Sequence, residues 1–296
     1  MNPSRRALAF AAAFAFLWAV LEQVLGSRLQ QEYDLRQVVW SRYATHLAVL
    51  VAIFAWREPA LLWRTRRPVL QLGRSFLMLL MPLSFLHALL AGQSGHLVWA
   101  QFWITPVLLL ALAAGMLGER VPVILWGCGA VAAAAAMAAA GPARAPNAAE
   151  ILLPLSMTLS FCLYVVATRG LRHERLRANL FHTALVPFAL LSFAMPWAWR
   201  TPTPHDALVL AGIGTVGLAA LACLDRAIER GGVALVAPTL ALQAGFVLLL
   251  SHGRPASALE WAIVACLVAV GLVSWRLAGD ARVAAPDAAL ATGASR

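Results

Sequence analysis

The amino-acid sequence predicts an all-α membrane protein with ten transmembrane helices in two inverted five-helix repeats. Composition, the lengths of the apolar runs and the placement of arginine lead to this prediction. Of the 296 residues, 61% are apolar and only 12% are charged, and the mean hydropathy is +0.77. A soluble domain has roughly 25% charged and 45–50% apolar residues, so most of this surface needs the bilayer as its solvent.

Apolar runs of about 17–25 residues, the length that crosses roughly 30 Å of hydrocarbon, mark the spans. The alanine-rich run at 122–140 is the weakest of them, because alanine favours insertion less than leucine does. The first run follows Arg5 and Arg6, and we interpret it as an uncleaved span because no small-x-small cleavage site follows it. The ten predicted spans cover residues 7–26, 37–56, 69–90, 98–117, 122–140, 150–168, 179–199, 207–224, 233–250 and 257–275.

Arginine placement predicts the orientation, since all 23 basic residues are arginine. With ten spans, 16 arginines lie on the side of the N-terminus, 5 lie on the other side, and Arg42 and Arg74 lie within spans. Excess positive charge marks the cytoplasmic side, so we expect a bacterial inner-membrane protein with both termini in the cytoplasm. Because the arginines sit in short loops and not on one polar face, no nucleic-acid partner is expected. The tail, residues 279–296, is expected to be disordered.

A weak internal repeat divides the chain at the turn-rich segment 141–147. The fourth span of each half has an early proline, Pro106 in the first half and Pro238 in the second. Five spans per half is an odd number, so the second half enters the membrane with the opposite orientation. Inverted repeats of this kind are typical of secondary transporters. We therefore expect two repeats, residues 1–141 and 148–278.

The stretch from Trp103 through Pro106 to Gly118-Glu119-Arg120 resembles the signature of the EamA-type drug/metabolite transporters. The proline precedes the glutamate by thirteen residues, as it does in that family. Trp18 and Arg42 also stand where the family often has a tryptophan and an arginine. The resemblance spans residues 7–278. It implies ten helices in two inverted repeats around a central cavity, with both termini inside.

The second half departs from the family pattern. Thirteen residues after Pro238 lies Ser251, followed by His252, where the family usually has a second glutamate. The resemblance therefore leaves the role of a glutamate pair in doubt. It also leaves the substrate open, because members carry amino acids, nucleotide sugars, polyamines and drugs.

Ionisable residues within spans are the first functional candidates, because each costs about 2.5–3.5 kcal/mol to insert. Glu22 and Arg42 lie at similar depth on either side of the first turn, which predicts an ion pair that either locks this hairpin or acts in gating or coupling. Arg74, about one turn into the third span, either snorkels to the interface or contacts an anionic substrate. Glu119, at the expected cytoplasmic mouth, is either a solvated charge or a latch of the inner gate.

Aromatic and polar stripes are the candidates for substrate binding. Trp99, Phe102 and Trp103 share one helix face, which is either an interfacial belt or a cradle for a flat organic molecule. Tyr164 extends a polar stripe in the sixth span, and Thr239 and Gln243 form another in the ninth. Such stripes also hold helices together. The prolines at 106 and 238 are either hinges or ordinary kinks.

No catalytic, metal or cofactor site is expected. The sequence has no HExxH or GxSxG motif, and its cysteines and histidines show no ligand spacing. The sequence therefore predicts a secondary active or facilitative carrier of small organic metabolites or drugs, with export as the favoured direction. The alternative is an integral-membrane enzyme or an assembly factor without transport activity. The expected partners are a small-molecule substrate and the lipid bilayer, and a homodimer stays open.

Overall fold

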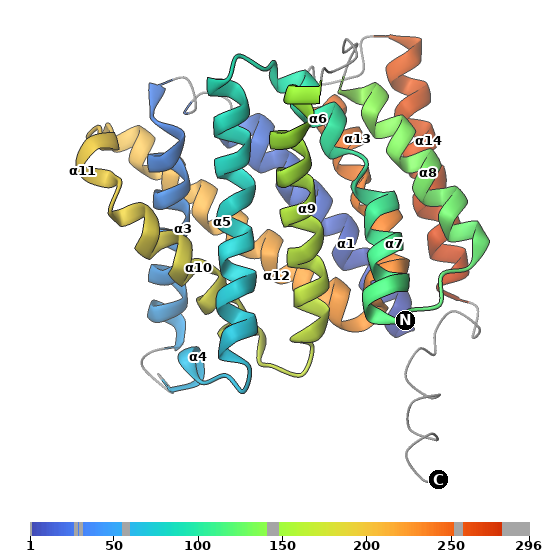
Figure 1. Ribbon diagram of the computed structural model, residues 1–296, viewed down its shortest axis with the longest axis horizontal. Coiled ribbons are helices and arrows are strands. Elements are labelled where there is room, and N and C mark those ends of the chain that lie inside the picture. Colours follow the sequence, from blue (N-terminus) through green and yellow to red (C-terminus); the bar gives the residue numbers. More distant parts are fainter. Residues whose placement is uncertain are drawn as a thin grey trace.

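The structure is a computed structural model that describes residues 2–26, 29, 32–54, 60–140, 148–251 and 257–279. Within these ranges every regular element is helical (Figure 1). The elements are α1 (Pro3–Val20), η1 (Leu21–Gly26), α3 (Leu35–Phe54), α4 (Ala60–Trp63), α5 (Pro68–Leu90), α6 (Gly95–Phe102), α7 (Thr105–Leu117), α8 (Val123–Ala139), α9 (Ala148–Gly170), α10 (Leu176–Ser192), α11 (Met195–Ala198), α12 (Pro204–Leu240), α13 (Leu242–Ser251) and α14 (Ala258–Leu277).

Seven helices in the described part of the chain are long and apolar enough to cross a membrane. Large apolar side chains also remain exposed around the bundle, among them Val123 at 86%, Val69 at 83% and Trp197 at 83%. An apolar surface of this extent is not stable in water, so lipid tails must cover it. The prediction of an all-helical chain of membrane type is confirmed at this level.

The ten predicted spans all overlap helical residues, but their helices differ in length. The predicted spans at 122–140, 179–199 and 233–250 fall on shorter or interrupted helices, namely α8, α10 and the end of α12 with α13. The eighth predicted span and the first part of the ninth both lie within α12, which changes direction between them at Gly232 (φ 75°, ψ 172°). Glycine adopts this left-handed conformation without a steric penalty.

Two broken helices run in opposite directions through the bundle. In the first half, α6 ends at Phe102 and α7 begins at Thr105. In the second half, the segment Val233–Leu240 of α12 is followed at once by α13. The two prolines stand on different sides of these breaks, since Pro106 follows the first and Pro238 precedes the second. Figure 1 shows α6 and α7 running from top to bottom, and α13 continuing upward from the end of α12.

The two described ends of the chain meet at one end of the bundle. The side-chain amide of Asn2 donates a hydrogen bond to the carbonyl of Ala278 at 3.2 Å. The Arg5 guanidinium also lies 6.0 Å from the centre of the Trp275 ring. The two described ends of the chain therefore lie side by side. Residues 280–296 of the predicted tail and His252 lie outside the described residues.

The two halves share one core. Helix α1 packs along α12, α5 packs on α9, and α3 packs on α10 and α12. Helices α3 and α12 approach closely at Gly214, where an added Cβ atom would collide with the side chain of Thr45. From Ala220 to Leu240 most residues of α12 are buried, and helices of both halves pack against this helix.

Candidate functional site

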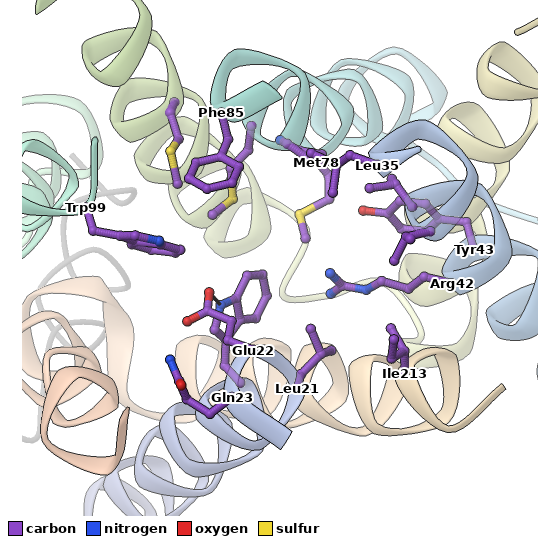
Figure 2. Close-up of a pocket in the computed structure, with 16 residues that line it drawn as sticks. Leu21, Glu22, Gln23, Leu35, Arg42, Tyr43, Met78, Phe85, Trp99 and Ile213 are labelled. Atoms are coloured by element: carbon purple, nitrogen blue, oxygen red, sulfur yellow. Dashed lines mark hydrogen bonds between the residues drawn. The ribbon is translucent and has the colours of Figure 1, made fainter. Parts of the chain in front are cut away.

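A cavity of about 290 Å³ lies between helices of both halves (Figure 2). Its walls are mostly aromatic and aliphatic, with three methionines, and its charged side chains are Glu22 and Arg42. Pockets of about 300–1,000 Å³ with apolar walls and few polar groups commonly bind small molecules. The lining residues are Trp18, Leu21, Glu22, Gln23, Leu35, Val38, Val39, Arg42, Tyr43, Met78, Met81, Pro82, Phe85, Trp99, Met157 and Ile213.

A second cavity of about 400 Å³ adjoins the first and shares Glu22, Gln23 and Trp99 with it. Its other lining residues are Trp103, Ala139, Ala140, Gln243, Ala244, Val247, Leu248, Ser251 and Glu260. Several of these stand where helices begin or end, opposite the contact between Asn2 and Ala278. We call the end of the bundle near Ala140, Ser251 and Glu260 the open end, and the end near Asn2 and Ala278 the closed end.

Glu22 lies at the junction of the two cavities, on the π-helical turn η1 that continues α1. Its Oε1 accepts a hydrogen bond from Nε1 of Trp18 at 2.6 Å. Its Oε2 accepts a hydrogen bond from Nε2 of Gln243 at 2.9 Å. Single π-helical turns often occur at functional sites. Because Gln243 comes from α13, this carboxylate joins the two halves at the cavity.

Arg42 extends into the same cavity from α3 (Figure 2). Its Cζ atom lies 5.0 Å from the centre of the Trp18 ring and 5.7 Å from that of Tyr43. Its buried Nε and Nη2 atoms have no hydrogen-bond partner among the described residues. The predicted ion pair between Glu22 and Arg42 is therefore wrong, because the carboxylate bonds to two neutral donors and the guanidinium stacks on aromatic rings.

A buried ionic cluster lies between the cavity and the closed end. Nη2 of Arg74 donates to Oδ1 of Asp225 at 2.7 Å and to the hydroxyl of Tyr164 at 2.7 Å. The Arg74 side chain is fully buried and that of Asp225 is 3% exposed. The predicted alternative in which Arg74 snorkels to the interface is therefore wrong, because Asp225 of α12 holds the guanidinium in the interior.

Glu119 seals the closed end, at the point where α12 changes direction. Its Oε2 accepts from the backbone N–H of Ala234 at 2.8 Å, and its Oε1 from that of Val233 at 3.2 Å. Its Oε1 also lies 3.3 Å from Nε of Arg169. A carboxylate at a helix N-terminus is favourable, because it fills orphan N–H groups and interacts with the helix dipole. The side chain is only 9% exposed, so Glu119 is not a solvated charge.

Arg169 completes this seal from α9. Its Nη1 donates to the backbone carbonyls of Ile228 at 3.2 Å and Glu229 at 3.0 Å. These carbonyls precede the turn at Gly232, and the N–H groups that Glu119 binds follow it. One ion pair between α9 and the end of α7 therefore satisfies the backbone on both sides of the break in α12.

The other predicted site residues divide between these regions. Trp99, Trp103 and Gln243 line the cavities. Phe102 does not, because it is 2% exposed and packs against Trp99, Trp103 and Phe161. Tyr164 belongs to the ionic cluster, and Thr239 is buried within α12. Pro106 stands at the start of α7 and Pro238 within α12.

Sequence reasoning missed Asp225, because the eighth predicted span ended at residue 224. The unpaired Arg74 within the third span was the signal that could have found it, since a buried arginine needs a counter-charge. The methionines and Phe85 were also missed, because apolar residues in a span carry no mark of the cavity they face.

Comparison with known proteins gives the fold. No family model matches this chain, and no curated protein matches its sequence. A solved structure, described only as the crystal structure of a protein, has a TM-score of 0.76 and 19% identity, over 93% of this chain and 99% of that one. Agreement across nearly the whole of both chains shows that they share one fold.

Proposed function

We propose that this protein is a secondary carrier that moves small organic molecules across a bacterial inner membrane by alternating access. The supporting observation is the contrast between the two ends of the bundle. Two adjoining cavities between the helices lie toward the open end. At the other end, buried ionic contacts at Asp225 and Glu119 hold the helices together, and the pocket of about 850 Å³ at the start of α5 is a shallow groove on the surface. A carrier caught facing one side has this combination of an accessible central site and a sealed opposite gate.

Ten crossings in two inverted repeats are part of the proposal. The contact between the two described ends and the two oppositely directed broken helices support it. With the arginine distribution, the closed end near Asn2 faces the cytoplasm and the open end faces outward. Substrate sites of carriers with inverted repeats lie between the repeats, near broken helices. Glu22 and Gln243 meet at such a place, because they join α1 of the first half to α13 of the second.

In the proposed transport cycle, the contacts that seal the closed end break while the open end closes around the substrate. Opening toward the cytoplasm separates Arg74 from Asp225 and withdraws Glu119 from the segment that begins at Val233. Removing one partner from a buried ion pair costs about 3–5 kcal/mol, so the closed end opens only when new contacts replace the lost ones. Closure of the open end around a substrate supplies those contacts, as the binding energy shifts the population between the two states.

A substrate screen with purified protein in proteoliposomes tests this function. Amino acids, nucleosides, polyamines, sugars and aromatic drugs are first compared for thermal stabilisation, and stabilising compounds are then tested for flux. We expect saturable flux of one class, reduced at least about tenfold by Trp99→Ala, because this ring lines both cavities and an aromatic contact of this size contributes more than 1.4 kcal/mol.

Trp197→Ala is the matched control, since Trp197 is 83% exposed on α11 and its loss leaves the cavities intact. Absence of stabilisation and flux in every class would count against a carrier. It would favour the alternative of a membrane enzyme or an assembly factor. An equal loss of flux in both tryptophan variants would count against these cavities as the transport site.

A further inference from the structure

The two charged side chains of the cavity, Glu22 and Arg42, differ in how far their hydrogen-bonding groups have partners. Both oxygens of Glu22 already accept hydrogen bonds, from Trp18 and from Gln243. In Arg42, by contrast, the buried Nε and Nη2 atoms have no hydrogen-bond partner among the described residues. Arg42 is also the only cationic side chain among the residues that line the two described cavities. The charged donors without a partner in this space therefore belong to a cation, and an anion would satisfy them.

The faces of the Arg42 guanidinium are covered by neighbouring side chains, and the group reaches the cavity from α3. The guanidinium stacks near the rings of Trp18 and Tyr43. Behind it, Gly217 of α12 allows close approach, since an added Cβ atom there would lie 2.7 Å from Nε of Arg42. Nε thus packs against α12, while the guanidinium as a whole lines the cavity, where its planar N–H groups match two oxygens of a carboxylate. Packing thus orients this side chain without satisfying its N–H groups.

The walls around this charge suit an apolar body. Phe85 and Trp99 lie across the cavity from Arg42 (Figure 2), and Met78, Met81 and Met157 complete the wall. Aromatic rings and thioethers adapt to flat, polarisable groups. The volume of about 290 Å³ admits a molecule of one or two rings.

From these contacts we infer that the substrate is a small organic carboxylate, with its acid group on Arg42 and a ring-bearing apolar body against Phe85 and Trp99. This inference rests on the proposed carrier function and names its substrate class. It also gives a direction, because an inside-negative membrane potential drives an anion out of the cell. Export then needs no coupling ion, and Glu22 acts as a fixed link between α1 and α13.

Three probes with one body and different charge test the inference. The carboxylate 3-phenylpropanoate, its neutral amide 3-phenylpropanamide and the cationic 3-phenylpropylamine are titrated into the full chain in detergent by isothermal titration calorimetry. We expect the carboxylate to bind at least tenfold more tightly than the amide or the amine. Arg42→Gln should weaken carboxylate binding at least tenfold, and Arg42→Lys should weaken it less because the charge remains. Arg64→Gln, which removes an exposed arginine, should have no effect.

The wild-type preference among the probes decides the question even if the Arg42→Gln protein does not fold. The anion site is overturned if the amine or amide binds as tightly as the carboxylate, if no carboxylate binding is detected, or if a folded Arg42→Gln protein keeps its affinity. A different result would contradict the proposed carrier function alone. Binding that depends on Arg42, without carboxylate flux into proteoliposomes, would support the anion site and contradict a carrier.

Discussion

Replacing Asp225 with asparagine is expected to lower the stability of the protein by about 3–5 kcal/mol, because it leaves the charge of Arg74 buried without its partner. Arg74 is fully buried and bonds to both Asp225 and Tyr164. Asparagine keeps the size of the side chain, so the loss reports the charge and not a cavity. Thermal unfolding of the purified protein in detergent measures the effect. Flux should fall as well, since the closed end loses its deepest contact.

Glu229→Gln is the matched control for this change. Glu229 forms an ion pair with Arg226 at 2.8 Å, with side chains 36% and 37% exposed, and such pairs contribute about 0–1 kcal/mol. The double variant Arg74→Met with Asp225→Leu should regain most of the lost stability, because an apolar pair of similar size can replace a buried ion pair. An Asp225→Asn protein that unfolds at the wild-type temperature would contradict the assignment of this cluster as a seal.

Glu119→Ala is expected to cost about 2–4 kcal/mol, the sum of a lost helix cap and a lost charged hydrogen bond. The change exposes the N–H groups of Val233 and Ala234 and removes the partner that Arg169 has in Glu119. The segment of α12 after Gly232 should then become mobile, while distant helices stay protected. Hydrogen–deuterium exchange of the peptide that contains residues 233–240 measures this directly.

The control for this second change is Glu32→Gln, which removes the same charge from an exposed side chain near the open end. It should leave exchange in residues 233–240 unaltered. Unchanged exchange in the Glu119→Ala protein would mean that the break in α12 is held by other contacts, and Glu119 would lose its place in the gate.

Glu22 in the first predicted span and Arg42 in the second show what the sequence could predict and what it could not. Apolar runs located the helices, because the length of a run follows from the thickness of the bilayer. They also placed Glu22 and Arg42 near the same depth, and both line one cavity. Depth does not give the rotation of a helix, however. Glu22 faces Gln243 of α13 and Arg42 faces Trp18, and only tertiary packing decides these partners.

The closed end was harder to predict for a related reason. The role of Asp225 depends on α12 continuing past the last apolar residue of its run, and that of Glu119 depends on a turn at Gly232 more than a hundred residues away. The GER stretch drew attention to Glu119, but not to its two backbone donors. Trp99, Trp103 and Gln243 were predicted by type and spacing, and the structure places all three at the cavities.

Alternating access is the central claim, and cysteine accessibility from the two sides of the membrane tests it most directly. The native cysteines at 128, 162, 223 and 266 are first replaced. Val247→Cys then reports on the cavity, and Thr168→Cys on the closed end one turn below Tyr164, where Thr168 is 3% exposed. A membrane-impermeant maleimide is applied to right-side-out and inside-out vesicles.

We predict that the cysteine at 247 reacts from the outside and the cysteine at 168 reacts from neither side. Adding Asp225→Asn should reverse this pattern, with position 168 reacting from the cytoplasmic side and position 247 becoming protected. Reaction of both positions from one side at the same time, or protection that Asp225→Asn does not alter, would contradict alternating access.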